Sequence, residues 1–237
     1  MALTEHFFDN REALFESLTA LCEQTLEQAC NDTGRATFMA SGGSTPAPLY
    51  QALSEASLPW SQIDVALVDE RWVDPQNPSS NQTFIEESLL QNKAAKAPYT
   101  VMKNAAATAK DGLAQTSANY AQLSSPWDVT ILGMGGDGHT ASIFPDCDGI
   151  EQALDANSDE LVQTIIAKRS EVTGDNLERI TLSLAGLLKS RQLILLITGD
   201  AKRTVYQQAL ENTDHRKMPV SAVLQQQQVP VHVFWAP

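Results

Sequence analysis

The chain has 237 residues, of which 43% are hydrophobic and 19% charged, ordinary proportions for a folded globular protein. Its longest apolar run, residues 193–197, is far shorter than the ~20 residues of a membrane-spanning helix, so no membrane is expected among its partners. Residues 1–6 lack the basic and apolar regions of a signal peptide, and the expected location is the cytoplasm.

The formal net charge of −13 argues against nucleic acids and anionic membranes as the main partners. An anionic small molecule would therefore need a local cationic site that overcomes the overall field. The three cysteines, Cys22, Cys30 and Cys147, form no Cys-x-x-Cys pair and have no metal-ligand spacing with a histidine. Reduced structural thiols and no bound metal are expected.

Apolar residues at helical spacing predict a helix over residues 11–30 that carries Cys22 and Cys30 and that Gly34 ends. Beyond it, apolar runs alternate with helical segments. The predicted strands are 36–41, 63–69, 127–133, 161–167, 180–183, 193–198 and 231–235. The predicted helices are 46–53, 81–91, 108–123, 201–210 and 220–225.

This alternation predicts an α/β fold with right-handed β-α-β crossovers and a mostly parallel sheet between helical layers. Most of the strands are almost continuously apolar, as strands covered on both faces should be. No linker or internal repeat interrupts the chain, so residues 1–237 are expected to form one domain. Ligands of open α/β sheets bind beyond the carboxyl ends of the strands, and the residues just after each strand are the candidates for a site.

The first predicted strand is followed by Ser41-Gly42-Gly43-Ser44-Thr45-Pro46. Thr45 can act as the N-cap of the next helix, and Pro46 suits the first helical position. The two glycines allow several backbone N–H groups to point at one spot beside the positive end of a helix, which is an arrangement suited to phosphate. An ordinary strand-to-helix turn favours the same residues and is the alternative.

The second strand leads into Asp69-Glu70-Arg71-Trp72-Val73-Asp74, in which three carboxylates surround one arginine. Arg71 could grip a phosphate or hold a carbonyl oxygen, and Asp69 could orient a base or accept a proton. The alternative is an internal cluster of ion pairs.

The third strand leads into Gly133-Met134-Gly135-Gly136-Asp137-Gly138-His139-Thr140-Ala141-Ser142. Its glycines match the dinucleotide-binding pattern Gly-x-Gly-x-x-Gly, which requires an acidic residue at the carboxyl end of the next strand. That strand ends instead in Lys168 and Arg169, so a bound nicotinamide cofactor is not expected. A histidine two residues after an aspartate at a strand's carboxyl end suits acid–base chemistry.

Gly199-Asp200-Ala201-Lys202-Arg203 follows the strand at 193–198. With Asp200 as N-cap, Lys202 and Arg203 lie in the first helical turn, where cations oppose the helix dipole at a cost of roughly 0.3–1 kcal/mol each. A bound anion would reverse that effect and would explain both residues. Two solvated side chains are the alternative.

Together these segments resemble the 6-phosphogluconolactonase family. The resemblance extends from about residue 36 to the last strand and is carried by the segments Ser41–Pro46, Asp69–Val73, Ser80-Asn81, Gly133–Pro145 and Thr198-Gly199 with Lys202. The resemblance implies a Rossmann-like, three-layer α/β/α fold and hydrolysis of the phosphosugar lactone 6-phospho-D-glucono-1,5-lactone. It also implies no cofactor, and in particular no nicotinamide cofactor. The segment 172–178 lacks the prolines that members of this family often carry there.

Glucosamine-6-phosphate deaminases share the fold and several of these motifs, and an enzyme of that type is an alternative. Their motif resembles Asp-Gly-His-Ile-Ala-Phe-Asn-Glu-Pro, in which the glutamate moves protons, whereas Phe144 stands at that position here. Where the deaminases have Asp-Glu-Tyr, this chain has Arg71 in place of the tyrosine. Both differences favour lactone hydrolysis. A further alternative is a non-catalytic phosphosugar sensor, against which the presence of both Asp137 and His139 argues.

The resemblance suggests a mechanism in which residues 41–45, Lys202 and Arg203 hold the phosphate and His139 is the general base. Arg71 or N–H groups of the glycine-rich loop would stabilise the oxyanion. Either Asp137 or Asp69 would orient His139. The protein is expected to be a monomer or a small homo-oligomer.

Overall fold

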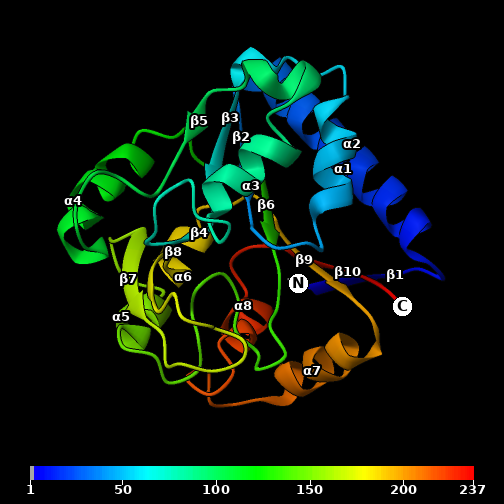
Figure 1. Ribbon diagram of the computed structural model, residues 1–237. Coiled ribbons are helices and arrows are strands. Elements are labelled where there is room, and N and C mark those ends of the chain that lie inside the picture. The colour runs from blue at the N-terminus through cyan, green and yellow to red at the C-terminus, as the bar shows by residue number, and fades with distance from the viewer. Residues whose placement is uncertain (1–2) are drawn as a thin grey trace.

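A parallel sheet of seven strands runs through the molecule (Figure 1). The structure, a computed structural model, describes residues 3–237. In spatial order the strands are β1 (Leu3–Phe7), β10 (Val231–Ala236), β9 (Leu193–Thr198), β6 (Val129–Leu132), β2 (Ala36–Ala40), β3 (Ile63–Leu67) and β5 (Tyr99–Thr100). Every neighbouring pair is parallel, and β2, β3 and β6 are buried along their whole length, as their apolar sequences predict.

Helices cover both faces of this sheet, which confirms the predicted three-layer class. They are α1 (Arg11–Thr33), α2 (Ala47–Ser54), α3 (Asn81–Ser88), α4 (Ala109–Tyr120), α5 (Ile150–Leu154), α6 (Leu184–Leu187), α7 (Asp200–Glu211) and α8 (Val220–Gln225). Figure 1 shows α1 and α2 on one side of the sheet and α7 and α8 on the other. Two short 3₁₀ turns lie at Trp60–Gln62 and Asn92–Lys96. Within residues 3–237, no helix combines the length and apolarity that a membrane crossing requires.

Two of the predicted strands, 161–167 and 180–183, lie in a second, antiparallel sheet and not in the parallel one. Residues 162–166 form β7 (Val162–Ile166) and residues 178–182 form β8 (Glu178–Leu182), which pair antiparallel with each other. β8 also pairs antiparallel with β4 (Asp69–Arg71), so the order of this second sheet is β4-β8-β7. The chain changes sheet at Val68, whose N–H donates to Ala40 and whose carbonyl accepts from Leu182.

The boundaries of α1 agree with the prediction. The Asn10 side chain accepts a hydrogen bond from the N–H of Ala13 at its start, and Gly34, with φ 80°, ends it in the left-handed conformation that glycine favours. Cys22 and Cys30 lie on this helix, and all three cysteines are buried and unpaired by disulfides. Burial raises the pKa of the Cys22 thiol, as expected of an unreactive structural residue.

Two predicted helix caps are wrong by one residue. The N-cap of α2 is Pro46 rather than Thr45, and no side chain caps that helix. The N-cap of α7 is Gly199 rather than Asp200, so Asp200 is the first helical residue. Strands β1 and β5 were not predicted, because β1 is a partly exposed, polar edge strand and β5 has only two residues.

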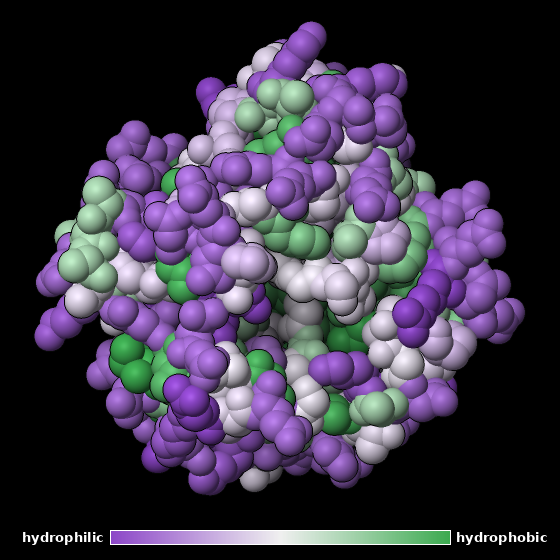
Figure 2. Space-filling model, in the orientation of Figure 1, coloured by the Kyte–Doolittle hydropathy of each residue, from purple (hydrophilic) through white to green (hydrophobic). Residues whose placement is uncertain are grey.

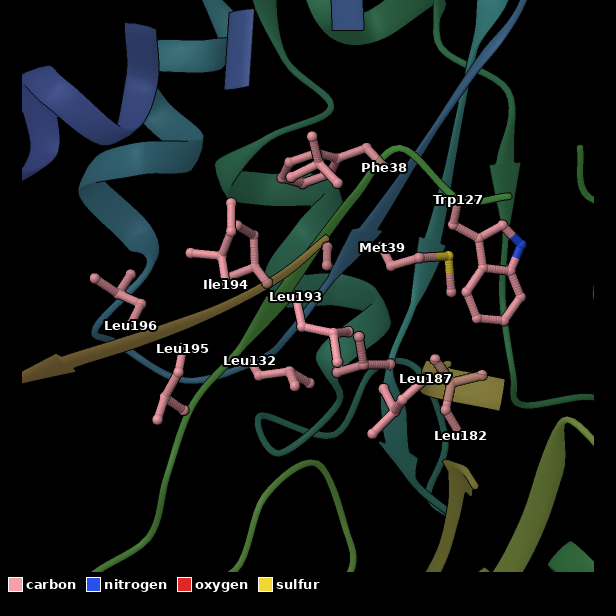
Figure 3. Packing of buried hydrophobic residues seen from close by; sticks show 14 of the residues in the cluster. Phe38, Met39, Trp127, Leu132, Leu182, Leu187, Leu193, Ile194, Leu195 and Leu196 are labelled. Carbon is pink, nitrogen blue, oxygen red and sulfur yellow. The ribbon is translucent and has the colours of Figure 1, made fainter. Parts of the chain in front are cut away.

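One hydrophobic core joins the two sheets. Figure 3 shows Phe38 and Met39 of β2 near residues of β9, together with Leu182 of β8. A smaller cluster lies beside this core and consists of Ile143, Phe144, Cys147, Ile150, Ala153, Ile165 and Ala167.

Two buried tyrosine hydroxyls fix the carboxyl ends of neighbouring strands. The hydroxyl of Tyr50 accepts from the N–H of Ser41 (3.0 Å) and donates to its carbonyl (2.8 Å), just after β2. The hydroxyl of Tyr120 does the same at Leu67, the last residue of β3 (3.0 and 2.8 Å). Each tyrosine therefore satisfies both backbone groups of a residue next to the loops that follow these strands.

We expect Tyr120→Phe to lower the free energy of unfolding by about 1–3 kcal/mol, because it leaves a buried N–H and a buried carbonyl of Leu67 without a partner. Urea denaturation measures this change. Tyr206→Phe is the matched control, since within residues 3–237 the hydroxyl of Tyr206 bonds only the carboxylate of the exposed Glu5, which water can solvate after the change. Equal stability losses in the two variants would contradict the assigned role of Tyr120.

Candidate active site

A cavity of about 390 Å³ lies at the carboxyl ends of β2, β4, β6 and β9. The face shown in Figure 2 is hollowed near its centre, where pale and green residues lie among hydrophilic ones. The residues predicted from the strand ends that line the cavity are Ser41, Gly42, Gly43, Thr45, Asp69, Arg71, His139 and Lys202. The cavity therefore brings together side chains from all four segments that sequence analysis selected.

Three of the predicted residues lie outside the cavity lining. Ser44 is exposed, and Asp137 contacts His139 without lining the cavity itself. The guanidinium of Arg203 packs over Trp235 at 4.4 Å and over Phe7 at 4.9 Å from the ring centroids. Successive helical residues point about 100° apart, so Lys202 can face the cavity while Arg203 faces the sheet edge.

His139 and Asp137 form a close pair. Nδ1 of His139 lies 2.6 Å from Oδ1 of Asp137, and the same oxygen accepts a hydrogen bond from the backbone N–H of His139 at 3.1 Å. A tight turn creates this geometry: the N–H of Gly135 donates to the carbonyl of His139, and Gly138 has φ 79°. A Cβ on Gly135 would lie 2.0 Å from Nδ1 of His139, so only glycine fits there.

The pair determines how the imidazole can act. Because the carboxylate accepts a hydrogen bond from Nδ1–H, the neutral ring has its unprotonated nitrogen at Nε2. Burial alone would raise the pKa of the Asp137 carboxyl, but its hydrogen bond with His139 and the charge of that residue outweigh burial and lower the pKa. Among residues 3–237, Asp137 is the only hydrogen-bond partner of the His139 ring.

Asp69 has a different environment, and no hydrogen bond joins it to His139 in the described residues. Its carboxylate accepts hydrogen bonds from the hydroxyl of Ser142 and from the side-chain amide of Asn81 (3.3 Å). The same amide donates to the backbone carbonyl of Asp69 at 2.9 Å. A Cβ on Gly42 would lie 1.9 Å from the Asn81 side chain, so the loop after β2 packs closely against this group.

Glu70 holds the start of α3 in place. Its buried carboxylate accepts hydrogen bonds from the backbone N–H groups of Arg71, Asn81 and Gln82 (2.7–2.8 Å) and from the hydroxyl of Ser80 (3.1 Å). Burial raises the pKa of this carboxyl, and the backbone hydrogen bonds partly offset the effect. Glu70 is therefore a structural anchor that sets the positions of Asn81 and Arg71.

Three cations face the cavity. Arg71 and Arg179 are direct partners across β4 and β8, and Arg179 was not among the predicted residues. Burial and the neighbouring charge of Arg71 lower the pKa of Arg179 to about 10. Lys202 donates to the carbonyl of Met134 at 2.7 Å, and burial lowers its pKa.

These cations provide the local positive charge that an anionic ligand would need in a protein of negative net charge. Of the described residues that line the cavity, Arg71, Arg179 and Lys202 are cationic and Asp69 is the one carboxylate, so with His139 neutral the lining carries two net positive charges. Like charges directly opposite each other on paired strands destabilise a sheet. A bound anion would neutralise the charges of Arg71 and Arg179. The cavity is thus locally cationic in a protein whose net charge is −13.

Sequence analysis did not predict Arg179 as a site residue, because β8 runs antiparallel to β4. Sequence analysis examined the carboxyl ends of strands, whereas it is the amino end of β8 that lies beside the carboxyl end of β4. The segment before β8 also contributes Val172, which lines the cavity and is 49% exposed. Arg179 fixes this segment by donating to the carbonyls of Thr173 (3.0 Å) and Asn176 (2.6 Å).

In the part of the chain that the structure describes, no cluster of three or more histidine, cysteine, aspartate or glutamate side chains could hold a metal ion. The titratable and charged groups that line or adjoin the cavity are the His139–Asp137 pair, Asp69 and the three cations.

Comparison with known proteins identifies the family. A family model described as "Glucosamine-6-phosphate isomerases/6-phosphogluconolactonase" matches residues 9–235. The chain belongs to this family. A protein named 6-phosphogluconolactonase from Rhizobium meliloti (strain 1021) is 38% identical over 237 residues, all of both chains. Another protein of that name, from Mesorhizobium japonicum, is 36% identical and covers 97% of this chain and 94% of its own.

A solved structure supports the same assignment. The crystal structure of a 6-phosphogluconolactonase from Shewanella baltica OS155 is similar to this chain with a TM-score of 0.93 and 38% sequence identity. The match covers 99% of this chain and 98% of that one. That protein therefore has the same fold as this chain, including the arrangement seen in Figure 1.

Proposed function

We propose that this chain hydrolyses 6-phospho-D-glucono-1,5-lactone to 6-phospho-D-gluconate, a step of the oxidative pentose phosphate pathway. The full-length similarity to 6-phosphogluconolactonases supports this reaction. The observation that carries the chemistry is the His139–Asp137 pair at a locally cationic cavity, because it combines a base with an anion-binding environment.

The substrate phosphate is proposed to bind between the loop at residues 41–45 and Lys202. Lys202 lines the cavity, as do all residues of this loop except Ser44. The two segments follow β9 and β2, which flank β6 in the sheet. Gly43 has φ 93°, a conformation that lets the loop turn its backbone towards a ligand. Arg203 and Ser44 are not included, because neither lines the cavity. Binding the phosphate fixes where the far end of the substrate, the lactone carbonyl, must lie.

His139 is proposed to act as the general base. Nε2 takes a proton from a water molecule while the water oxygen attacks the lactone carbonyl carbon. When the tetrahedral intermediate collapses, the bond from that carbon to the ring oxygen breaks, and His139 returns the proton to the departing ring oxygen. Asp137 orients the imidazole and stabilises its protonated form, which leaves Asp69 to order Asn81 and the loop after β2.

The oxyanion of the intermediate is proposed to be stabilised by Arg71 and by the N–H of Gly136. The N–H groups of Gly135 and Gly138 are already occupied within the turn, donating to His139 and Gly135 respectively. Gly136 lines the cavity and, among the described residues, has no acceptor for its N–H. An oxyanion donor of this kind contributes on the order of 10²–10³ in rate.

The cellular setting that we propose is the cytoplasm, with residues 1–237 acting as one domain. Three buried free cysteines suit a reducing compartment, and the core shared by both sheets supports one folding unit. The partner is the phosphosugar lactone rather than a nucleic acid, for which the net charge is unsuited. A monomer or a small homo-oligomer is proposed.

We expect His139→Asn to lower kcat for lactone hydrolysis by about 10²–10⁴, because it removes the positioned base. In a coupled assay, glucose-6-phosphate dehydrogenase makes the lactone and 6-phosphogluconate dehydrogenase reports its hydrolysis. The wild type should abolish the lag caused by slow spontaneous hydrolysis. The control is His215→Asn, since His215 bonds Ser221 outside the cavity and its loss should leave kcat near the wild-type value. A fully active His139→Asn enzyme would rule out the proposed base.

We expect Lys202→Ala to raise KM strongly for the phosphorylated lactone and hardly at all for unphosphorylated glucono-1,5-lactone. The reason is that Lys202 is assigned to the phosphate and not to the reacting carbonyl. Arg203→Ala removes the adjacent cation, which lies outside the cavity, and should leave both KM values unchanged. Equal increases of KM for the two substrates in Lys202→Ala would show that the phosphate lies elsewhere.

A further inference from the structure

The ring of His139 packs against the ring of Phe144. Their centroids are 4.3 Å apart and their planes are inclined by 37°. Phe144 is 4% exposed and lines the cavity, and it belongs to the smaller apolar cluster. One side chain of that cluster therefore extends from the apolar core to the proposed base.

The backbone between the two residues holds Phe144 rigidly in this position. The N–H of Ile143 donates to the carbonyl of Thr140 at 2.9 Å, and the hydroxyl of Thr140 donates to the carbonyl of Gly133 at 2.9 Å. Ser142 is fully buried, and its N–H donates to the hydroxyl of Thr181 at 3.2 Å. These bonds tie the segment to the end of β6 and to β8, so the Phe144 ring has little freedom to move.

The Phe144 ring also meets Arg179. The guanidinium carbon of Arg179 lies 5.4 Å from the ring centroid, and Arg179 is itself 4% exposed and bonded to the carbonyls of Thr173 and Asn176. A cation near an aromatic face is attracted by the ring's electron density. The base, the aromatic ring and a fixed arginine thus form a continuous series of contacts along the cavity.

These contacts restrict the imidazole in a way that Asp137 alone does not. The hydrogen bond to Asp137 fixes Nδ1, but a ring held at one atom can still tilt about that bond. Contact with the Phe144 ring limits the tilt and thereby sets the direction of Nε2. A displacement of about 1 Å in a reacting group can cost about 10²-fold in rate.

We infer that Phe144 is a positioning residue, which acts with Asp137 to aim Nε2 of His139 at the attacking water. This inference rests on the proposed role of His139 as base. Phe144 stands where the deaminase motif has a glutamate, and the inference gives this apolar side chain a role in catalysis. Phe144 contributes orientation at a position where it cannot exchange a proton.

The test is Phe144→Leu, which keeps an apolar side chain in the cluster but removes the aromatic face. We expect kcat to fall by between about tenfold and about a hundredfold while KM for the phosphorylated lactone stays unchanged. The Cε1–H proton resonance of His139, assigned by its absence in His139→Asn, should also move, because the ring current of Phe144 is lost. Phe144→Tyr restores an aromatic ring and should recover most of kcat.

Ile150→Val is the matched control, because Ile150 belongs to the same cluster but does not line the cavity. It should leave both kcat and the His139 resonance unchanged. A wild-type kcat in Phe144→Leu would overturn the inference, as would an equal loss of kcat in Ile150→Val. If the proposed function were wrong, the wild-type protein itself would not hydrolyse the lactone. The effect of Phe144 on the His139 resonance could still be measured, because that measurement needs no substrate.

Discussion

The 2.6 Å contact between Nδ1 of His139 and Oδ1 of Asp137 is the interaction on which the rest of the site depends. This contact requires a turn so tight that Gly135 has no space for a Cβ. The same turn needs a left-handed backbone conformation at Gly138. Glycines after β6 therefore make room for this side-chain contact. The turn also occupies the N–H groups of Gly135 and Gly138, whereas that of Gly136, which lines the cavity, has no acceptor among the described residues.

Charge is organised locally in a protein whose overall field is unfavourable for an anion. Arg71, Arg179 and Lys202 come from three different strand ends, and each is partly fixed by donating to backbone carbonyls. Such preorganised cations need little rearrangement when a phosphate binds or an oxyanion forms. The two arginines oppose each other across β4 and β8, an arrangement that is unfavourable until an anion binds.

The sequence predicted the parts of the site that follow from parallel strands, because their carboxyl ends meet at one edge. Asp69, His139 and Lys202 were found in this way. Arg179 was missed because the chain changes sheet at Val68 and pairs there with an antiparallel strand, a tertiary event that no local pattern reveals. Arg203 was predicted to hold the phosphate with Lys202 but does not line the cavity, because charge in the first turn alone does not tell which face of α7 meets the cavity.

A double-mutant comparison tests most directly the claim that Asp137 and His139 work as one unit. Lactone hydrolysis would be measured for Asp137→Asn, for His139→Asn and for the variant with both changes. Residues that act as a unit have non-additive effects, so the double variant should be no slower than His139→Asn alone. A double variant whose loss of kcat equals the product of the two single losses would show that Asp137 acts independently, and would contradict the account.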